Sequence, residues 1–259
     1  MLAVAEDDAR LFAAVDGPEA APPVVLLHSI GCDHRMWTEQ MPALAEWRTI
    51  RPDIRGHGRS DAPAGDYALP RLADDVLRIL DALDVERAVV CGLSLGGVIA
   101  QALALRAPSR VRGLALANTA ARIGAAEAWT QRAALVRAEG LGAVAEMAMA
   151  RFFSPTFRTE HAADVAAFRN GLLATSPQGY AGCCAVLRDA DLTRQIARIA
   201  APTLVIGGAL DVSTPPEQTR SLADAIPGAT YVELDAAHLS NVERPKAFAA
   251  ALVKHLESC

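Results

Sequence analysis

The sequence predicts an α/β fold in which a mostly parallel central sheet has helices on both faces and one all-helical insertion. Short apolar runs of strand length alternate with longer amphipathic runs, a pattern typical of parallel strands joined by helical crossovers. One strand-like run leads through the turn Gly92–Gly96 directly into a helix-like run. Between residues 121 and 190 the strand-like runs stop, and Ala, Leu, Arg and Met recur at helical spacing.

The elements of the first half follow from local patterns in chain order. Residues 1–20 are expected to form a hairpin with Asp16-Gly17 as its turn. A helix is predicted over 70–83, because Leu72, Val76 and Ile79 fall on one face. The other predicted elements are strands at 24–28, 49–53, 88–91 and 111–118 and a helix at 95–106.

The second half returns to the strand pattern after the helical stretch. The runs 203–207 and 230–234 are apolar and β-branched, as buried parallel strands are. We therefore expect a core domain made of residues 1–120 and 191–259, with a helical cap of residues 121–190 inserted in it. A cap over the sheet edge would form a substrate pocket and exclude water.

Ser94 is the candidate nucleophile. It is the centre of Gly92-Leu93-Ser94-Leu95-Gly96, between a predicted strand and a predicted helix. This G-x-S-x-G pattern is typical of a sharp strand-to-helix turn that presents a serine hydroxyl beside a helix N-terminus. The pattern also occurs by chance in glycine-rich sequence, so the interpretation depends on partners elsewhere in the chain.

Two such partners follow in the order Ser, acid, His that an α/β-hydrolase triad has. Asp211 comes just after the strand at 203–207, and His238 lies on the loop after the next strand. Because functional groups gather at the carboxyl ends of parallel strands, Ser94, Asp211 and His238 are predicted to meet there. Asp211 taken alone could also be a turn or N-cap residue, and Asp235 is a competing acid.

The loop after the first parallel strand is the candidate second half of an oxyanion hole. One donor would be the backbone N–H of Leu95, the residue after the nucleophile. By position in His28-Ser29-Ile30-Gly31, the other donor is assigned to Ile30, with Ser29 as the alternative.

Composition argues against several other classes of protein. A hydrophobic content of 52% with 21% charged residues is unlike a disordered chain, and a net charge of −5 without a basic block disfavours nucleic acid as a partner. We expect no membrane span and no signal peptide. Five cysteines without metal-ligand spacing fit reduced thiols in a cytoplasm, with no metal and no cofactor.

Several motifs together resemble the 3-oxoadipate enol-lactonases of the α/β-hydrolase superfamily, over about residues 24 to 250. The general ones are the loop Asp53–Ser60 and the segment around Ser94, which occur in many hydrolases with helical caps. More specific are Asn118–Gly124, Trp129, Gly179-Tyr180 and the histidine loop Ala236–Pro245. The resemblance assigns the triad to Ser94, Asp211 and His238.

The resemblance implies a substrate, a five-membered enol-lactone with an acetate side chain from bacterial aromatic catabolism. Its carboxylate would need a cationic partner, and the arginines near the cap are Arg122, Arg132 and Arg151. Of these we take Arg122, with Trp129, as the candidate substrate-binding residues, although a surface arginine and a cap anchor are the plainer interpretations.

Three alternatives stay open. His28 stands where the lactonases are expected to carry Asn, and a His at this place is more typical of esterases, so the chain could act on small acyl esters. The same triad could use peroxide as a perhydrolase. A third hypothesis is a ligand receptor with little or no enzymatic activity, which an intact triad disfavours. The oligomeric state is not readable from the sequence.

Overall fold

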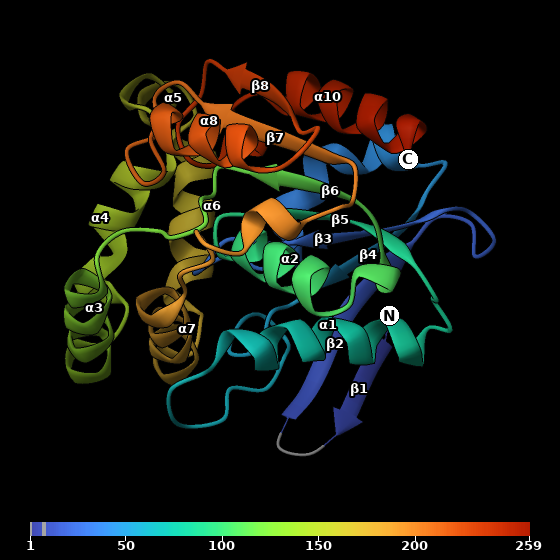
Figure 1. The fold of residues 1–259 in the computed structure, drawn as a ribbon. Helices are drawn as coiled ribbons and strands as arrows, with labels where there is room; N and C mark the ends of the chain where they lie inside the picture. Colours follow the sequence, from blue (N-terminus) through green and yellow to red (C-terminus); the bar gives the residue numbers. More distant parts are fainter. Residues whose placement is uncertain (1, 7–8) are drawn as a thin grey trace.

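Figure 1 shows the computed structural model, which describes residues 2–6 and 9–259, as a twisted sheet flanked by helices. Within these residues eight strands pair in the order β1-β2-β4-β3-β5-β6-β7-β8. All neighbours from β4 to β8 are parallel, whereas β2 pairs antiparallel with both β1 and β4. The predicted mostly parallel sheet is confirmed. The strands are β1 Leu2–Glu6, β2 Ala9–Asp16, β3 Pro23–Leu27, β4 Arg48–Pro52, β5 Ala88–Leu93, β6 Val111–Ala117, β7 Thr203–Gly208 and β8 Thr230–Leu234.

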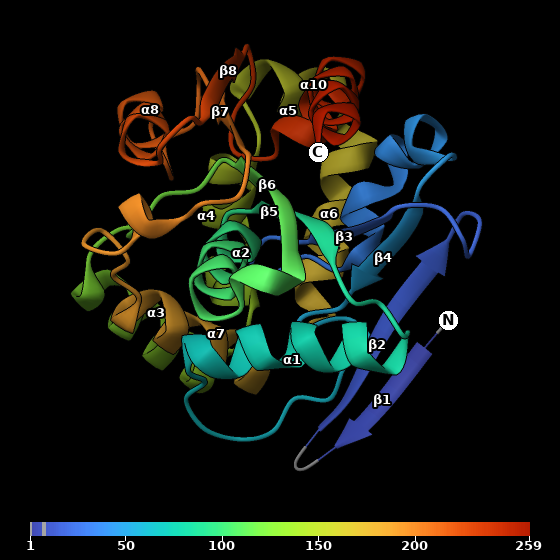
Figure 2. The same cartoon turned by 45° about the vertical axis from the view of Figure 1, so that its right-hand side comes forward.

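Helices cover both faces of this sheet, as Figures 1 and 2 show. Three of them, α1, α2 and α8, lie on one face, and η1 packs with α10 on the other. Because α2 lies between the sheet and α1, it is apolar on nearly all sides, which explains why its sequence shows no single hydrophobic stripe. The bounds are η1 His34–Leu44, α1 Leu69–Ala82, α2 Leu95–Arg106, α8 Pro216–Ala225, α9 Ser240–Glu243 and α10 Pro245–Ser258.

The segment between β6 and β7 is helical, as its spacing predicts. Its described residues contain five α-helices and no strand. These helices lie beside the carboxyl ends of the parallel strands (Figure 1), where loops of the sheet can reach them. They are α3 Ala126–Glu139, α4 Gly142–Phe152, α5 Pro155–Glu160, α6 Ala162–Leu173 and α7 Pro177–Asp189.

The turn expected for the opening hairpin was wrong. β1 and β2 do pair antiparallel, but Glu6 faces Ala9, so Asp16-Gly17 does not join them; residues 7 and 8 lie outside the described residues. Asp16-Gly17 instead ends β2. Gly17 has a φ of 85° and packs so closely on the Trp47 carbonyl that a Cβ would collide with it. The Asp-Gly pair therefore marks a chain reversal, but a later one.

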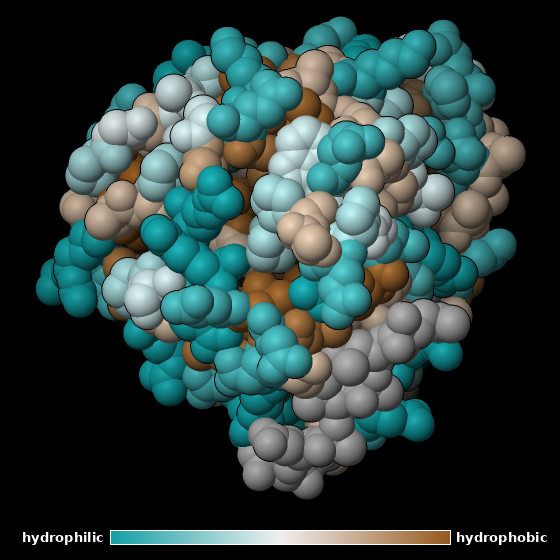
Figure 3. Space-filling view, turned by 90° about the vertical axis from the view of Figure 1, so that its right-hand side faces the viewer, coloured by the Kyte–Doolittle hydropathy of each residue, from teal (hydrophilic) through white to brown (hydrophobic). Residues whose placement is uncertain are grey.

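The surface is largely hydrophilic on the face turned to the viewer in Figure 3, with hydrophobic residues in narrow bands between polar ones. None of the described helices combines the length and the hydropathy of a membrane span.

Two buried histidines join the loops that follow β3 and β4. The backbone N–H of Gly31 donates to His57 Nε2 over 2.9 Å, and the N–H of Ile54 donates to His28 Nε2 over the same distance. In each ring Nε2 accepts a hydrogen bond and so carries no proton, which makes each imidazole neutral. Burial lowers the pKa of His28, and burial together with the nearby His28 ring lowers the pKa of His57 to about 3.

We predict that this arrangement makes the fold acid-sensitive. Below about pH 6.5 the unfolded chain protonates His57, whereas the folded chain does so only near pH 3. The free energy of unfolding should therefore fall with decreasing pH, by up to ~1.4 kcal/mol per pH unit from this residue. His57→Gln has no imidazole to protonate and so does not lose stability in this way. In urea unfolding, the difference in free energy of unfolding between the wild type and His57→Gln should therefore become smaller as the pH falls from about 6.5 to 4.5. A difference that is constant over this range would contradict the prediction.

Candidate active site

Ser94 lies on a strained turn between β5 and α2. Its φ of 56° and ψ of −115° are unusual for a residue with a side chain. The turn is possible because Gly92 lies against the Gly96 carbonyl and Gly96 lies against the Leu27 carbonyl, where Cβ atoms would collide. The Ser94 N–H donates to the Ala117 carbonyl over 3.0 Å, which holds the turn onto the end of β6.

Asp211 follows β7 and is almost fully buried. Its Oδ2 accepts hydrogen bonds from His238 Nδ1 over 2.8 Å, Asn118 Nδ2 over 3.0 Å and Thr214 Oγ1 over 2.7 Å. Burial alone would raise the pKa of Asp211, but the His238 ring and these hydrogen bonds outweigh it and hold the pKa below its usual range. The carboxylate is therefore ionised and fixed in orientation beside His238.

His238 lies on the loop after β8 and lines the same cavity as Ser94. Its ring stacks on Phe152 of α4 with centroids 6.2 Å apart, and the next residue, Leu239, donates its N–H to the Phe152 carbonyl over 3.0 Å. The helical segment thus contacts the histidine loop directly. The structure brings the three predicted residues to one end of the sheet.

Asp235, the competing acid, points elsewhere. Its exposed carboxylate pairs with Arg244 at 3.2 Å, whereas the carboxylate on His238 Nδ1 is that of Asp211. The sequence analysis missed a role for Asn118, whose amide links Asp211 to the Ala237 carbonyl. Its position directly after β6 was the available signal, because that is the sheet edge at which the other functional groups lie.

The predicted oxyanion donors flank Ser94. Ile30 lines the cavity with Ser94, and Ser29, the alternative donor, does not. Leu95 is the first residue of α2, so its backbone N–H belongs to the free N-terminal turn of that helix.

The cavity around Ser94 has a volume of about 90 Å³ and is roofed by α3, α4 and α7. Trp129, predicted to bind substrate, lines it, and its indole N–H is already used by the Ile123 carbonyl at 2.6 Å. Arg132 lies over the Trp129 ring with its guanidinium carbon 4.5 Å from the centroid. The thirteen lining residues are Ile30, Ser94, Ile123, Gly124, Ala128, Trp129, Arg132, Ala148, Arg151, Phe152, Tyr180, Ser213 and His238.

Arg122, the other predicted substrate-binding residue, is not among these. Its side chain is half exposed and lies 3.6 Å from Asp191. It lies before α3 begins, whereas Arg132, nearly two turns into that helix, reaches the cavity. The structure therefore corrects the choice of Arg122 in favour of Arg132 and Arg151.

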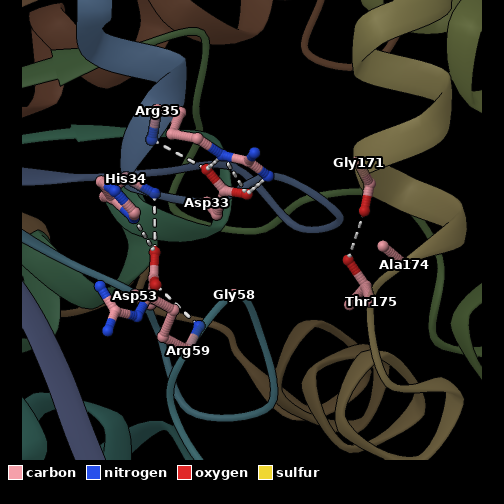
Figure 4. Close-up of a pocket in the computed structure, with 9 residues that line it drawn as sticks. All are labelled: Asp33, His34, Arg35, Asp53, Gly58, Arg59, Gly171, Ala174 and Thr175. Atoms are coloured by element: carbon pink, nitrogen blue, oxygen red, sulfur yellow. Dashed lines mark hydrogen bonds and ion pairs between the residues drawn. The ribbon is translucent and has the colours of Figure 1, made fainter.

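A second cavity, of about 260 Å³, lies between the loops after β3 and β4 and the end of α6 (Figure 4). It contains no triad residue. Asp33, His34 and Asp53 bring possible metal-ligand atoms within 4.8 Å of one another, the one such group among the residues that the structure describes. The carboxylate oxygens already have partners. Asp33 accepts from Arg35, and Asp53 accepts from His34 and from the Arg59 N–H. We therefore interpret the group as a link between the loops after β3 and β4.

Comparison with known proteins places this geometry in a family. Residues 22–245 match the alpha/beta hydrolase fold family. The chain is 39% identical to 3-oxoadipate enol-lactonase 2 of Acinetobacter baylyi, over 93% of this chain and 91% of that protein. The solved enol-lactonase from Burkholderia xenovorans LB400 is 42% identical to this chain, with a TM-score of 0.97. The match covers 99% of this chain and 100% of that one.

A thermophilic esterase from Thermogutta terrifontis, solved with malate bound, is also similar. It is 32% identical with a TM-score of 0.92, over 96% of this chain and 94% of that one. These matches span nearly the whole chain and include both the sheet and the helical segment. The chain therefore belongs to the α/β-hydrolase family and is an enzyme similar to its 3-oxoadipate enol-lactonases.

Proposed function

We propose that this enzyme opens a small enol-lactone that bears a carboxylate, of the type of 3-oxoadipate enol-lactone, through an acyl-enzyme on Ser94. One observation carries the substrate class. Arg132 and Arg151 line the cavity that holds Ser94 and His238, and no carboxylate among the described residues forms an ion pair with either guanidinium. Two unpaired cations beside a nucleophile suit a substrate that brings its own negative charge.

The two guanidinium groups are close enough to affect each other. Burial and the charge of Arg132 lower the pKa of Arg151. The Asp211 carboxylate offsets part of this repulsion, and a bound substrate carboxylate would offset more of it. Arg132 is the better placed of the pair, because its guanidinium lies over the Trp129 ring and it is less exposed than Arg151, which is only partly covered.

The reaction would proceed in two halves. His238 takes the proton of Ser94 as Oγ attacks the lactone carbonyl, while Asp211 holds the imidazole tautomer and stabilises the imidazolium. The N–H groups of Leu95 and Ile30 stabilise the oxyanion. The ring C–O bond breaks, and the enolate leaving group, still tethered to the acyl chain, takes the proton from His238 to give an enol. The enol then tautomerises to the ketone. Water activated by His238 then releases 3-oxoadipate and restores Ser94.

The helices of residues 121–190 would act as a cap in this scheme. They supply the arginines, Trp129 and Phe152, and they exclude bulk water from a cavity of about 90 Å³. A cavity this small and buried favours a short substrate. The enol-lactonase names of the relatives and the malate-bound esterase support an acidic substrate, and by the same analogy the reaction would serve aromatic catabolism.

Ser94→Ala should reduce kcat by several orders of magnitude, because it removes the attacking oxygen and leaves only binding and the oxyanion donors. The fold should be unchanged, since alanine removes only the Oγ and leaves the backbone bonds of the turn in place. Steady-state kinetics with circular dichroism as a fold control would measure this. Turnover within tenfold of the wild type would contradict the acyl-enzyme.

Arg132→Met should lower kcat/KM for the carboxylate-bearing lactone by about 10- to 100-fold, the loss expected for one charged hydrogen-bonded partner. Its activity on p-nitrophenyl acetate, which has no distal carboxylate, should change little. Arg122→Met is the matched control, since Arg122 pairs with Asp191 outside the cavity. Equal losses on the lactone and the neutral ester would contradict the assigned role of Arg132.

A further inference from the structure

We propose that His57 is a positioning residue for the oxyanion hole, which holds the Ile30-Gly31 peptide so that the Ile30 N–H meets the developing oxyanion. This inference rests on the proposed function, because it takes Ser94 as the nucleophile and Ile30 as a donor. His57 does not line the cavity. It would act only through the backbone of the loop that follows β3.

The contact that carries the proposal is the 2.9 Å hydrogen bond from the Gly31 N–H to His57 Nε2. The Gly31 nitrogen belongs to the same rigid peptide unit as the Ile30 carbonyl. The Ile30 N–H lies in the preceding peptide unit, with the Ser29 carbonyl. Its direction is set when both peptide units on either side of Ile30 are held. The adjacent Cys32 N–H also bonds back to the Ser29 carbonyl over 3.1 Å, which closes a tight turn around Ile30.

Gly31 is held from its other side by the helical segment. It has a φ of 76°, and a Cβ there would lie 2.6 Å from Leu172 Cδ1 and 3.2 Å from the Tyr180 ring. The loop is therefore confined between Leu172 and Tyr180 on one side and His57 on the other. If the acceptor on His57 were lost, the buried Gly31 N–H would be unsatisfied, and rotation of the peptide toward another acceptor would misdirect Ile30.

His57 is itself placed as a fixed acceptor. Its Nδ1 lies 3.4 Å from the Arg55 carbonyl, which favours the proton on Nδ1 and leaves Nε2 free to accept. The flanking Gly56 packs backbone to backbone on Gly179 of α7, where a Cβ on either residue would collide. Arg55 is anchored to Asp75 by two bonds of 2.8 and 2.7 Å. The loop that carries the ring is therefore anchored to α1 and to the helical segment.

The arrangement is reciprocal. The loop after β3 contributes His28 to the Ile54 N–H, and the loop after β4 contributes His57 to the Gly31 N–H, with the two rings 5.3 Å apart. Asp53 adds a third link, since it accepts from the N–H groups of both His34 and Arg59 (Figure 4). His28 Nδ1 also donates to the Ser29 carbonyl over 2.8 Å, in the peptide unit that carries the Ile30 N–H, and His57 binds the peptide unit that follows. Both histidines therefore hold the turn around Ile30, and loss of the His57 acceptor is expected to affect the transition state.

The test compares His57→Leu, which removes the acceptor, with His57→Gln, whose amide oxygen can still accept from Gly31. Removal of an oxyanion donor outright costs about 100- to 1,000-fold in kcat, so misplacing it should cost about 10- to 100-fold. On p-nitrophenyl acetate we expect the kcat of His57→Leu to be lower than that of the wild type by this factor, while its KM stays within threefold of the wild-type value. The kcat of His57→Gln should lie close to that of the wild type. The affinity of phenylboronate, which forms a tetrahedral adduct on Ser94, should fall in parallel.

His255→Leu is the control for a general loss of buried histidine packing. His255 lies on α10, buried beside Cys259 and the middle of β6, away from the end of the strands where Ser94 lies. It should lower thermal stability while kcat stays within twofold of the wild type. A fall in kcat equal to that of His57→Leu would overturn the proposal.

The remaining outcomes separate this inference from the proposed function. Wild-type kcat in folded His57→Leu, with an inactive Ser94→Ala, would overturn the role of His57 and leave the triad intact. An active Ser94→Ala would instead overturn the proposed function. If His57→Leu does not fold, His57→Asn, whose shorter amide cannot reach Gly31, is compared with His57→Gln. Equal kcat in those two variants would overturn the proposal.

Discussion

The close backbone packing at Ser94 is the constraint on which the site depends. β5 enters the turn, α2 leaves it, and the Leu27 carbonyl at the end of β3 touches Gly96. Any side chain at these glycines would push the three segments apart. The strained Ser94 conformation is therefore maintained by the surrounding sheet, and it aims a hydroxyl group at the place where the loops after β3, β7 and β8 converge.

The other functional groups are held by hydrogen bonds within buried loops and not by regular elements. Asp211 is fixed by Asn118, Thr214 and His238, and the Ile30 loop is fixed between His57 and Tyr180. In the proposed mechanism the sheet edge supplies the reacting groups, and the helical segment supplies the roof and the cations. Chemistry and substrate choice would then be carried by different parts of the chain, which is consistent with esterases and lactonases sharing this framework.

The sequence alone predicted a mostly parallel sheet, the positions of its strands along the chain and the three residues Ser94, Asp211 and His238 that meet at its edge. These features show in local patterns, in G-x-S-x-G and in short apolar runs. The sequence failed where a position depends on how the helical segment packs on the sheet. Arg122 and Arg132 are equally plausible cap arginines in the sequence, and only the packing of α3 turns Arg132 inward. It also missed the link from His57 to Gly31, since residues 26 positions apart show no local pattern.

The most direct test of the account is kcat/KM on freshly generated 3-oxoadipate enol-lactone beside p-nitrophenyl acetate and a small alkyl ester. A buried cavity with two unpaired arginines predicts a value on the lactone that is orders of magnitude above both esters. Comparable or higher values on the neutral esters would contradict the assignment of an acidic lactone substrate and would identify the enzyme as an esterase with the same triad.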